Sequence, residues 1–403
     1  PSAGDVLVHS IKLSAIPDEY GAFHDIPSAY SSVPAAAIAR FPARSQGACG
    51  ACAFFAASSM MTLKYWAEAF RRGVSPTASS LPLLSAQGMV ACGRLPRNGD
   101  GAPTHAGGGW TTYDGGCCGA SLDRVMDYLI DHGITSEACY PYTSDATPCV
   151  ACARARGLSV EYPVCRDTCI PEYSSSHGLD PAAPFRVVRG LFADAQQTMY
   201  ADYSDLQLSS PLTGVRMFKG PENIARAMMR YGAMTCGIDV TPAFQSGTGV
   251  LWQEGVYTGV TADPGTEIPE GATSNIGSHA VVCYGFGTTD SGIPYWECLN
   301  SWGSTWGTGG NGHFKLRRGG PGAGVLGMDG TLPVRGGSPS PPSSHGCYDV
   351  AINPNDVHTA GMHTAPTPPR PSPPPPYTAP PPSRFVEVHS GTCEDHGYTM
   401  IDS

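Results

Sequence analysis

The sequence predicts an α+β protein of two lobes, because helical periodicity dominates its first half and strand signals dominate its second. Small and apolar residues recur at helical spacing after Cys52, at Phe55, Ala56, Ser59, Met60, Leu63, Ala67 and Phe70. From Met234 onward, short apolar runs bounded by glycine are typical of antiparallel strands. We therefore expect a helical lobe over about residues 45–180, a β-barrel or strongly coiled sheet over about 185–335, and a cleft where they meet.

Three helices are expected along the chain. The first runs from Cys52 to Arg71–Gly73, where cations meet the negative end of the helix dipole and a glycine stops the helix. It should bury one face. The second runs from an N-capping Ser121 to Gly133, and a third, short helix opens at Pro221.

Four strands are expected in the second lobe, and each is a short apolar or alternating run. They are Met234–Val240, Ala280–Phe286, Tyr295–Leu299 and Gly312–Leu316. Three cysteines fall within these strands and are expected to be buried thiols or to form a cross-strand bridge, namely Cys236, Cys283 and Cys298.

The two ends of the chain differ in composition from the predicted domain, which spans residues 26–335. Residues 1–25 show little periodicity and are interpreted as the remnant of a leader or pro-segment. Residues 336–384 are rich in proline and serine and predict an extended linker without a core. Residues 385–403, which include Cys393, are interpreted as the truncated start of a further module.

Composition excludes several classes of function. The net charge of −10 and a charged fraction of 14% offer no basic surface to nucleic acid or anionic lipid. No run of 18 or more apolar residues predicts a membrane span. Fifteen cysteines favour an oxidising compartment, so we expect the secretory pathway, with a vacuolar, lysosomal or extracellular destination. Because the count is odd, at least one thiol stays unpaired within the chain.

Three separated segments carry the chemistry. Gln46 to Phe54 comes directly before the first long helix, where backbone N–H groups and the helix dipole favour a thiolate at Cys52. His279 stands at the entry to a predicted strand of the other lobe. At the end of the next strand, Asn300 could hold the imidazole and Trp302 could cover it.

These segments resemble the papain family of cysteine peptidases, in the family's order of Cys, His and Asn, over roughly Ile26–Val334. The resemblance implies that Cys52 is the nucleophile, His279 the general base and acid, and Asn300 the residue that orients the imidazole. It further implies that the side chain of Gln46 and the backbone N–H of Cys52 stabilise the oxyanion.

The resemblance also implies substrate contacts and partners. Gly119 and Ala120 would bind substrate, Trp302 would shield the bond between histidine and asparagine, and Leu326 would lie near the floor of the pocket for the second residue upstream of the cut. An apolar floor favours a hydrophobic side chain over an unpaired guanidinium. The expected partners are protein or peptide substrates and an inhibitory propeptide, for a monomer that needs no metal or organic cofactor.

Within the family, the cysteine spacing resembles the cathepsin B branch. By that resemblance the disulfides would be Cys49–Cys117, Cys92–Cys165, Cys139–Cys169 and Cys149–Cys152. In the plainer papain pattern Cys92 would pair with Cys149 instead, and the sequence leaves both alternatives open.

Several positions depart from the family pattern. Ala53 replaces a tryptophan after the nucleophile, Cys118 an asparagine, Ala120 a glycine, and Ser278 an aspartate of papain. Only two residues separate Cys149 from Cys152, so the histidine-bearing occluding loop of the cathepsin B branch is expected to be absent. The resemblance then implies an endopeptidase that does not release C-terminal dipeptides.

Three other interpretations compete with a peptidase. Cys49-x-x-Cys52 at a helix start would suit thioredoxin-type redox chemistry. Cys149-x-x-Cys152 with Cys165-x-x-x-Cys169 has a spacing that zinc accepts. The unusual Ala53, Cys118 and Ala120 would suit a catalytically silent papain-fold binding protein.

Overall fold

A computed structural model describes residues 26–75, 81–92, 116–149, 220–263, 265–307, 310–319, 326–328 and 346–352, with short runs or single residues between 153 and 218. The predicted leader, the predicted C-terminal module and most of the predicted linker lie outside these residues, as do Cys152 and Cys393.

The helical half forms around one long helix, α2, which spans Cys52–Arg71 and confirms the first predicted helix. Around it lie α1 (Ala35–Ile38), α3 (Gln87–Cys92), the 3₁₀ turn η3 (Gly116–Cys118) and α4 (Leu122–Asp131). Ser121 occupies the predicted N-cap position of α4, although its side chain makes no capping hydrogen bond.

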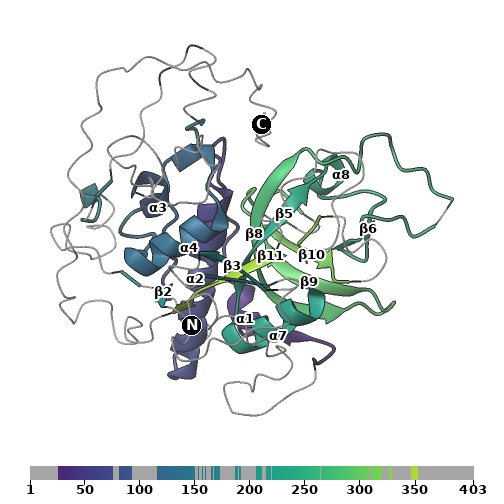
Figure 1. The fold of residues 1–403 in the computed structure, drawn as a ribbon, viewed down its shortest axis with the longest axis horizontal. Coiled ribbons are helices and arrows are strands. Elements are labelled where there is room, and N and C mark those ends of the chain that lie inside the picture. The colour runs from purple at the N-terminus through teal and green to yellow at the C-terminus, as the bar shows by residue number, and fades with distance from the viewer. Residues whose placement is uncertain are drawn as a thin grey trace, which may run out of the picture.

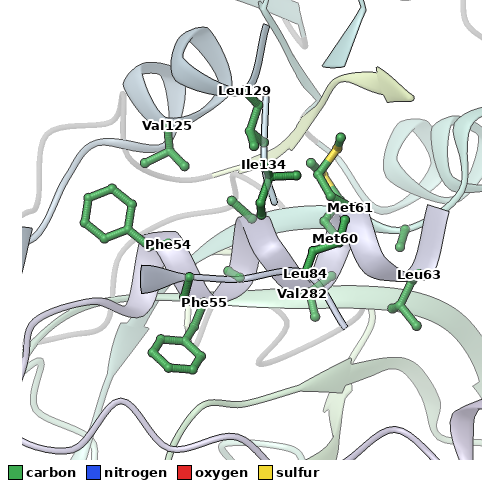
Figure 2. Packing of buried hydrophobic residues seen from close by; sticks show 14 of the residues in the cluster. Phe54, Phe55, Met60, Met61, Leu63, Leu84, Val125, Leu129, Ile134 and Val282 are labelled. Carbon is green, nitrogen blue, oxygen red and sulfur yellow. The ribbon is translucent and has the colours of Figure 1, made fainter. Parts of the chain in front are cut away.

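Helix α2 is buried around most of its circumference, which differs from the single buried face expected from its periodicity. It packs against α4 on one side and against the long strand β8 (Gly277–Thr288) on another. Figure 2 shows Phe54 pointing to the side of Val125 and Leu129, and Phe55 to the opposite side. Because both halves enclose this helix, only its last turn, which includes Arg71, is exposed to solvent.

The strand half is a mixed sheet, most of whose strands lie at the right of Figure 1, in teal and green. All four predicted strands are confirmed, as β5 (Met234–Val240), β8, β9 (Pro294–Leu299) and β10 (His313–Arg317). The predicted third helix is α7 (Pro221–Tyr231), which ends before β5.

The remaining strands extend this sheet in the order β3-β4-β11-β5-β8-β9-β10-β7-β6, with β1 paired to β8. The pairs are antiparallel except β10 with β7. Their bounds are β1 Tyr30–Ser31, β3 Leu206–Ser210, β4 Val215–Phe218, β6 Trp252–Gln253, β7 Val256–Tyr257 and β11 Gly346–Asp349. A short helix, α8 (Pro242–Gln245), follows β5, and β12 (Ala351–Ile352) pairs with β2 (Gly190–Leu191).

Strand β11 lies within residues 336–384, for which an extended linker was predicted, and that prediction is wrong for residues 346–352. The strand pairs with β4 on one side and β5 on the other. Asp349 and Lys64 of α2 form a buried ion pair at 2.7 Å, with side-chain exposures of 0% and 4%. The proline-rich composition of the surrounding stretch gave no sign of this four-residue strand, because pairing with β4 and β5 stabilises it and local propensity does not.

Six disulfides link the described cysteines other than Cys52. They are Cys49–Cys117, Cys92–Cys165, Cys118–Cys149, Cys139–Cys169, Cys236–Cys347 and Cys283–Cys298. Three of the pairings implied by the cathepsin B resemblance are confirmed, and the alternative for Cys92 is excluded.

The expected Cys149–Cys152 pairing is wrong, because Cys149 bonds to Cys118. The chain before Cys149 runs against the loop that precedes α2, where the amide of Ala48 donates to the carbonyl of Asp145. This contact brings Cys149 to η3, and no local spacing reveals it.

None of the helices in the described part of the chain combines the length and the apolar character needed to cross a membrane.

Candidate active site

Cys52 is the first residue of α2 and the one cysteine without a disulfide among those that the structure describes. Its side chain is half-buried. Burial raises the pKa of the thiol, while hydrogen bonds from the backbone at Ala280, Ala53 and Cys52 itself act in the opposite direction. The contact with Ala280 places the sulfur against β8, at the residue that follows His279.

His279 and Asn300 come from neighbouring segments of the sheet, because β8 and β9 are paired and Asn300 directly follows β9. The distance from His279 Nε2 to Asn300 Oδ1 is 2.7 Å. Asn300 Oδ1 also accepts a hydrogen bond of 2.8 Å from the backbone N–H of Ser301, which identifies that atom as the amide oxygen. Since an oxygen acceptor requires a donor, Nε2 carries the proton and Nδ1 is free to take one.

The imidazole of His279 is enclosed by the protein. The indole of Trp302 stacks on it with ring centroids 4.5 Å apart. Burial lowers the pKa of His279 to about 4, although the hydrogen bond to Asn300 works to raise it. The pKa changes of Cys52 and His279 come from burial and hydrogen bonds, without a contribution from a charged neighbour.

Gln46 lies beside this pair because the chain before α2 is bonded to the chain after β9. The amide of Gln46 donates to the carbonyl of Ser301 at 2.8 Å, and the amide of Gly303 donates to the carbonyl of Arg44 at 2.9 Å. The hydroxyl of Ser301 donates to Gln46 Oε1 at 2.7 Å. That bond fixes the amide so that Nε2 faces the helix start, where one of its hydrogens reaches the carbonyl of Cys49 at 3.0 Å.

The loop that carries Gln46 also contacts the 142–149 segment. The hydroxyl of Tyr142 donates to the carbonyl of Gln46 at 2.8 Å. Gly47 has φ of +59°, and a Cβ there would overlap the backbone carbonyl of Asp145, so this close approach requires glycine. The loop therefore cannot shift without moving the 142–149 segment.

Arg44 anchors the same loop through a buried charge. Its guanidinium donates to Ser58 Oγ of α2 at 2.7 Å and to Glu137 Oε2 at 2.8 Å, and it lies 4.8 Å from the ring centroid of Phe55. The second carboxylate oxygen of Glu137 accepts from the amide of Tyr142 at 2.9 Å. The network joins the loop, the helix and the 137–142 segment.

The remaining predicted site residues are placed differently. Gly119 and Ala120 follow η3, whose Cys117 is bonded to Cys49 beside the helix start. The side chain of Leu326, however, is only 1% exposed and lies in the hydrophobic core of the strand half. Its contact with a substrate stays a prediction. Trp306 packs against Trp302 with ring centroids 5.1 Å apart, and it is 8% exposed.

Two competing interpretations can be weighed against the disulfides. Cys49 bonds to Cys117 and not to Cys52, so the C-x-x-C segment does not form a redox pair. The sulfur atoms of Cys149, Cys165 and Cys169 are all bound in disulfides, so none of them is available as the thiolate that zinc requires.

A family model described as papain family cysteine protease matches residues 35–329 of the chain. The chain belongs to the papain family. The matched segment includes Cys52, His279 and Asn300. The family assignment agrees with the observed helices and mixed sheet. The α+β fold expected from the sequence is therefore confirmed.

Relatives of this papain-family chain are distant in sequence. Thiol protease aleurain of Arabidopsis thaliana is 24% identical over 280 residues, covering 69% of the chain and 52% of aleurain. Cathepsin L of Sarcophaga peregrina is 25% identical over 278 residues, covering 68% of the chain and 55% of the relative. The chain thus spans about half the length of the curated relatives it matches. Procathepsin B S9 from Trypanosoma congolense aligns with a TM-score of 0.48 and 16% identity, covering 87% of this chain and 89% of that one.

Sequence reasoning missed the residues that hold the site together. Ser301 stands between two residues of a recognised motif, yet its own position gives no sign that its hydroxyl contacts Gln46. Nothing in the sequence around Tyr142 signals that its hydroxyl contacts the carbonyl of Gln46. Arg44 and Glu137 are 93 residues apart, and nothing local signals that they pair.

Proposed function

We propose that the chain is a cysteine endopeptidase that hydrolyses peptide bonds in proteins. The observation that carries the proposal is the placement of a disulfide-free, half-buried Cys52 at the start of α2, against the residue that follows His279. The geometry of His279 and Asn300 supports it, because Nδ1 is left as a proton acceptor on the ring.

In the proposed reaction, the thiol proton of Cys52 passes to Nδ1 of His279, and the thiolate attacks the carbonyl carbon of the peptide bond. The oxyanion is stabilised by the backbone N–H of Cys52 and by the second N–H of Gln46 Nε2. The imidazolium then protonates the departing amine as the C–N bond breaks. A water molecule, deprotonated by His279, hydrolyses the thioester and restores the thiol.

Burial opposes charge on each of the two groups when each is taken alone, because it raises the pKa of Cys52 and lowers that of His279 to about 4. Proton transfer from sulfur to nitrogen creates both charges together, so each gains the other as a counter-ion. The dipole of α2 adds to the stability of the thiolate. We therefore propose that the thiolate–imidazolium pair exists before substrate binds.

The central test is peptide hydrolysis under mild reduction, beside a Cys52→Ala variant of the same chain. We expect the variant to lose roughly 10⁴-fold or more in kcat. Undiminished hydrolysis by the variant would end the proposal.

The type of cleavage is the next step of the proposal. Cys149, which was expected to bond to Cys152, is bonded to Cys118 instead, and we propose that the chain has no occluding loop. We propose that the chain cuts within peptides and prefers a hydrophobic side chain at the second position upstream of the cut. Release of C-terminal dipeptides, or a preference for arginine at that position in a peptide library, would contradict the respective claim.

A catalytically silent binding protein is the second candidate, favoured by the burial that disfavours charge on Cys52 and His279. The rate of Cys52 alkylation by iodoacetamide distinguishes the two. A preformed ion pair keeps the rate nearly constant from about pH 4 to 8. A silent site reacts only at alkaline pH, as a buried thiol of raised pKa would.

The cellular compartment, the substrates and the partners of this activity are also proposals. We propose that the chain works in the secretory pathway, as a vacuolar, lysosomal or secreted protein, because the six disulfides among its described cysteines would persist in oxidising compartments. Proteins or peptides are the proposed substrates, and an inhibitory propeptide is a proposed partner of a monomer. Disulfide mapping of material purified from its cell of origin checks the first of these.

A further inference from the structure

Two adjacent cysteines, Cys117 and Cys118, form disulfides in different directions. Cys117 bonds to Cys49, three residues before Cys52, and the carbonyl of Cys117 also accepts from the amide of Gly50 at 2.9 Å. Cys118 bonds to Cys149. The η3 turn is therefore held to the nucleophile's loop on one side and to the 142–149 segment on the other.

These three segments also contact one another directly. The 142–149 segment meets the nucleophile's loop through the amide of Ala48 and the carbonyl of Asp145, and through the hydroxyl of Tyr142 and the carbonyl of Gln46. The close approach at Gly47 leaves no room between them. Each pair of segments is thus joined by a disulfide, by hydrogen bonds or by both, and the three form a closed triangle.

The edge formed by Gly119 and Ala120 follows the two cysteines directly, and its position depends on this triangle. Gly119 has φ of +88°, so the chain turns sharply after Cys118. With Cys117 fixed to Cys49, the Cys118–Cys149 disulfide is the second fixed point of the turn. Cys118 is only 4% exposed, and Cys149 is half-buried.

We propose that the Cys118–Cys149 disulfide is a positioning element for substrate: it holds the Gly119–Ala120 edge at a fixed distance from Gln46 and Cys52. This rests on the proposed peptidase function. It assigns a role to a link that replaces the expected Cys149–Cys152 bond, and it predicts that the disulfide acts on peptides long enough to reach the edge.

The test replaces both cysteines, as Cys118→Ala with Cys149→Ala, so that no new thiol is created. For a substrate with three residues upstream of the cut, KM rises and kcat/KM falls by between about tenfold and a hundredfold, because the edge is displaced. For an ester of a single N-acetylated amino acid, kcat/KM changes by less than about threefold. Alkylation of Cys52 by iodoacetamide keeps its rate.

A matched control is available in the same half. Cys139–Cys169 closes a chain separation of 30 residues and Cys118–Cys149 one of 31, so chain entropy predicts equal losses of stability. We expect the Cys139→Ala/Cys169→Ala chain to lose as much thermal stability while keeping kcat/KM for the long substrate. Equal losses of activity in both pairs, or equal losses on long and short substrates, would show a merely structural role and overturn the inference.

Two further arms keep the test decisive. If the double variant does not fold, graded dithiothreitol is applied to the unaltered chain, and loss of the Cys118–Cys149 link by mass spectrometry is compared with kcat/KM for the long substrate. Activity that outlasts the link overturns the inference. If the unaltered chain hydrolyses neither substrate, the proposed function fails and the inference fails with it. If the unaltered chain is active and the double variant keeps the same kcat/KM for the long substrate, only the inference is overturned.

Discussion

At the scale of single residues, the site is defined by which atom can donate and which can accept. The amide of Ser301 fixes the oxygen of Asn300, and that oxygen fixes the tautomer of His279. The hydroxyl of Ser301 fixes the amide of Gln46 in turn. One serine therefore influences both the proposed proton acceptor and the proposed oxyanion donor.

Removing the thiol should expose the intrinsic pKa of the imidazole. In Cys52→Ala, His279 has no counter-ion, and we expect it to titrate near the value of about 4 that burial imposes. Its unfolded pKa is about 6.5, so between these values the unfolded state binds more protons and stability increases with pH. The free energy of unfolding that the variant loses on acidification is on the order of 3 kcal/mol, and the loss is complete below about pH 4.

The measurements are the NMR titration of His279 and urea unfolding at about pH 4.5 and 7. In the parent chain the proposed thiolate would act as a counter-ion and raise the pKa of His279 above the value that burial alone imposes, so stability should depend less on pH across this window. Identical titrations of the parent and the variant would contradict a preformed ion pair.

Ser301→Ala should reduce kcat by about tenfold, because Gln46 loses one hydrogen bond that orients its amide. Gln46→Ala should cost more, about 10²- to 10³-fold, since it removes the donor itself. In the Gln46→Ala background, Ser301→Ala should have little further effect. Additive losses in the double variant would show that Ser301 acts elsewhere, and steady-state kinetics of the four chains decide it.

At the scale of elements, α2 connects the two halves. Its first residue lies against β8, and Lys64, toward its far end, is paired with Asp349 of β11. Lys64 also donates to the carbonyl of Tyr231, which ends α7. A helix held at both ends keeps its N-terminus in register with the strands that carry His279 and Asn300.

Asp349→Ala should destabilise the chain by about 3–5 kcal/mol, because it leaves a buried ammonium group without its counter-ion. Replacing both partners, as Lys64→Met with Asp349→Leu, should cost much less, since no charge remains to be buried. Urea midpoints at unchanged m-value measure both effects. A single variant as stable as the parent would mean that water reaches Lys64.

At the scale of the whole molecule, a strand from the C-terminal part of the chain completes the sheet. Strand β11 lies between β4 and β5, and Cys347 is bonded to Cys236 across 111 residues of chain. The core of the strand half includes both cysteines, with Phe218 and Val281. A fold closed by such distant contacts depends on residues far beyond the proposed site.

A chain that ends after Arg335 should therefore fail to fold, whereas one that ends after Ile352 should unfold cooperatively at a temperature close to that of the parent. The shorter chain loses the pairing of β4 with β5 through β11, one disulfide and the partner of Lys64. Thermal unfolding by circular dichroism checks this. Cooperative unfolding of the shorter chain would restore the domain end predicted at residue 335.

Elements whose signals are local can be predicted from the sequence. The periodicity after Cys52, the glycine-bounded runs that became β5, β8, β9 and β10, and the motifs around Cys52, His279 and Asn300 can all be read within short windows, because local side-chain patterns decide helix and strand. Contacts between distant segments are visible only in the folded chain: the Cys118–Cys149 bond, the burial of Leu326, the hydrogen bond from Ser301 to Gln46, and the strand β11. These depend on which surfaces meet after folding, and no spacing along the chain encodes that.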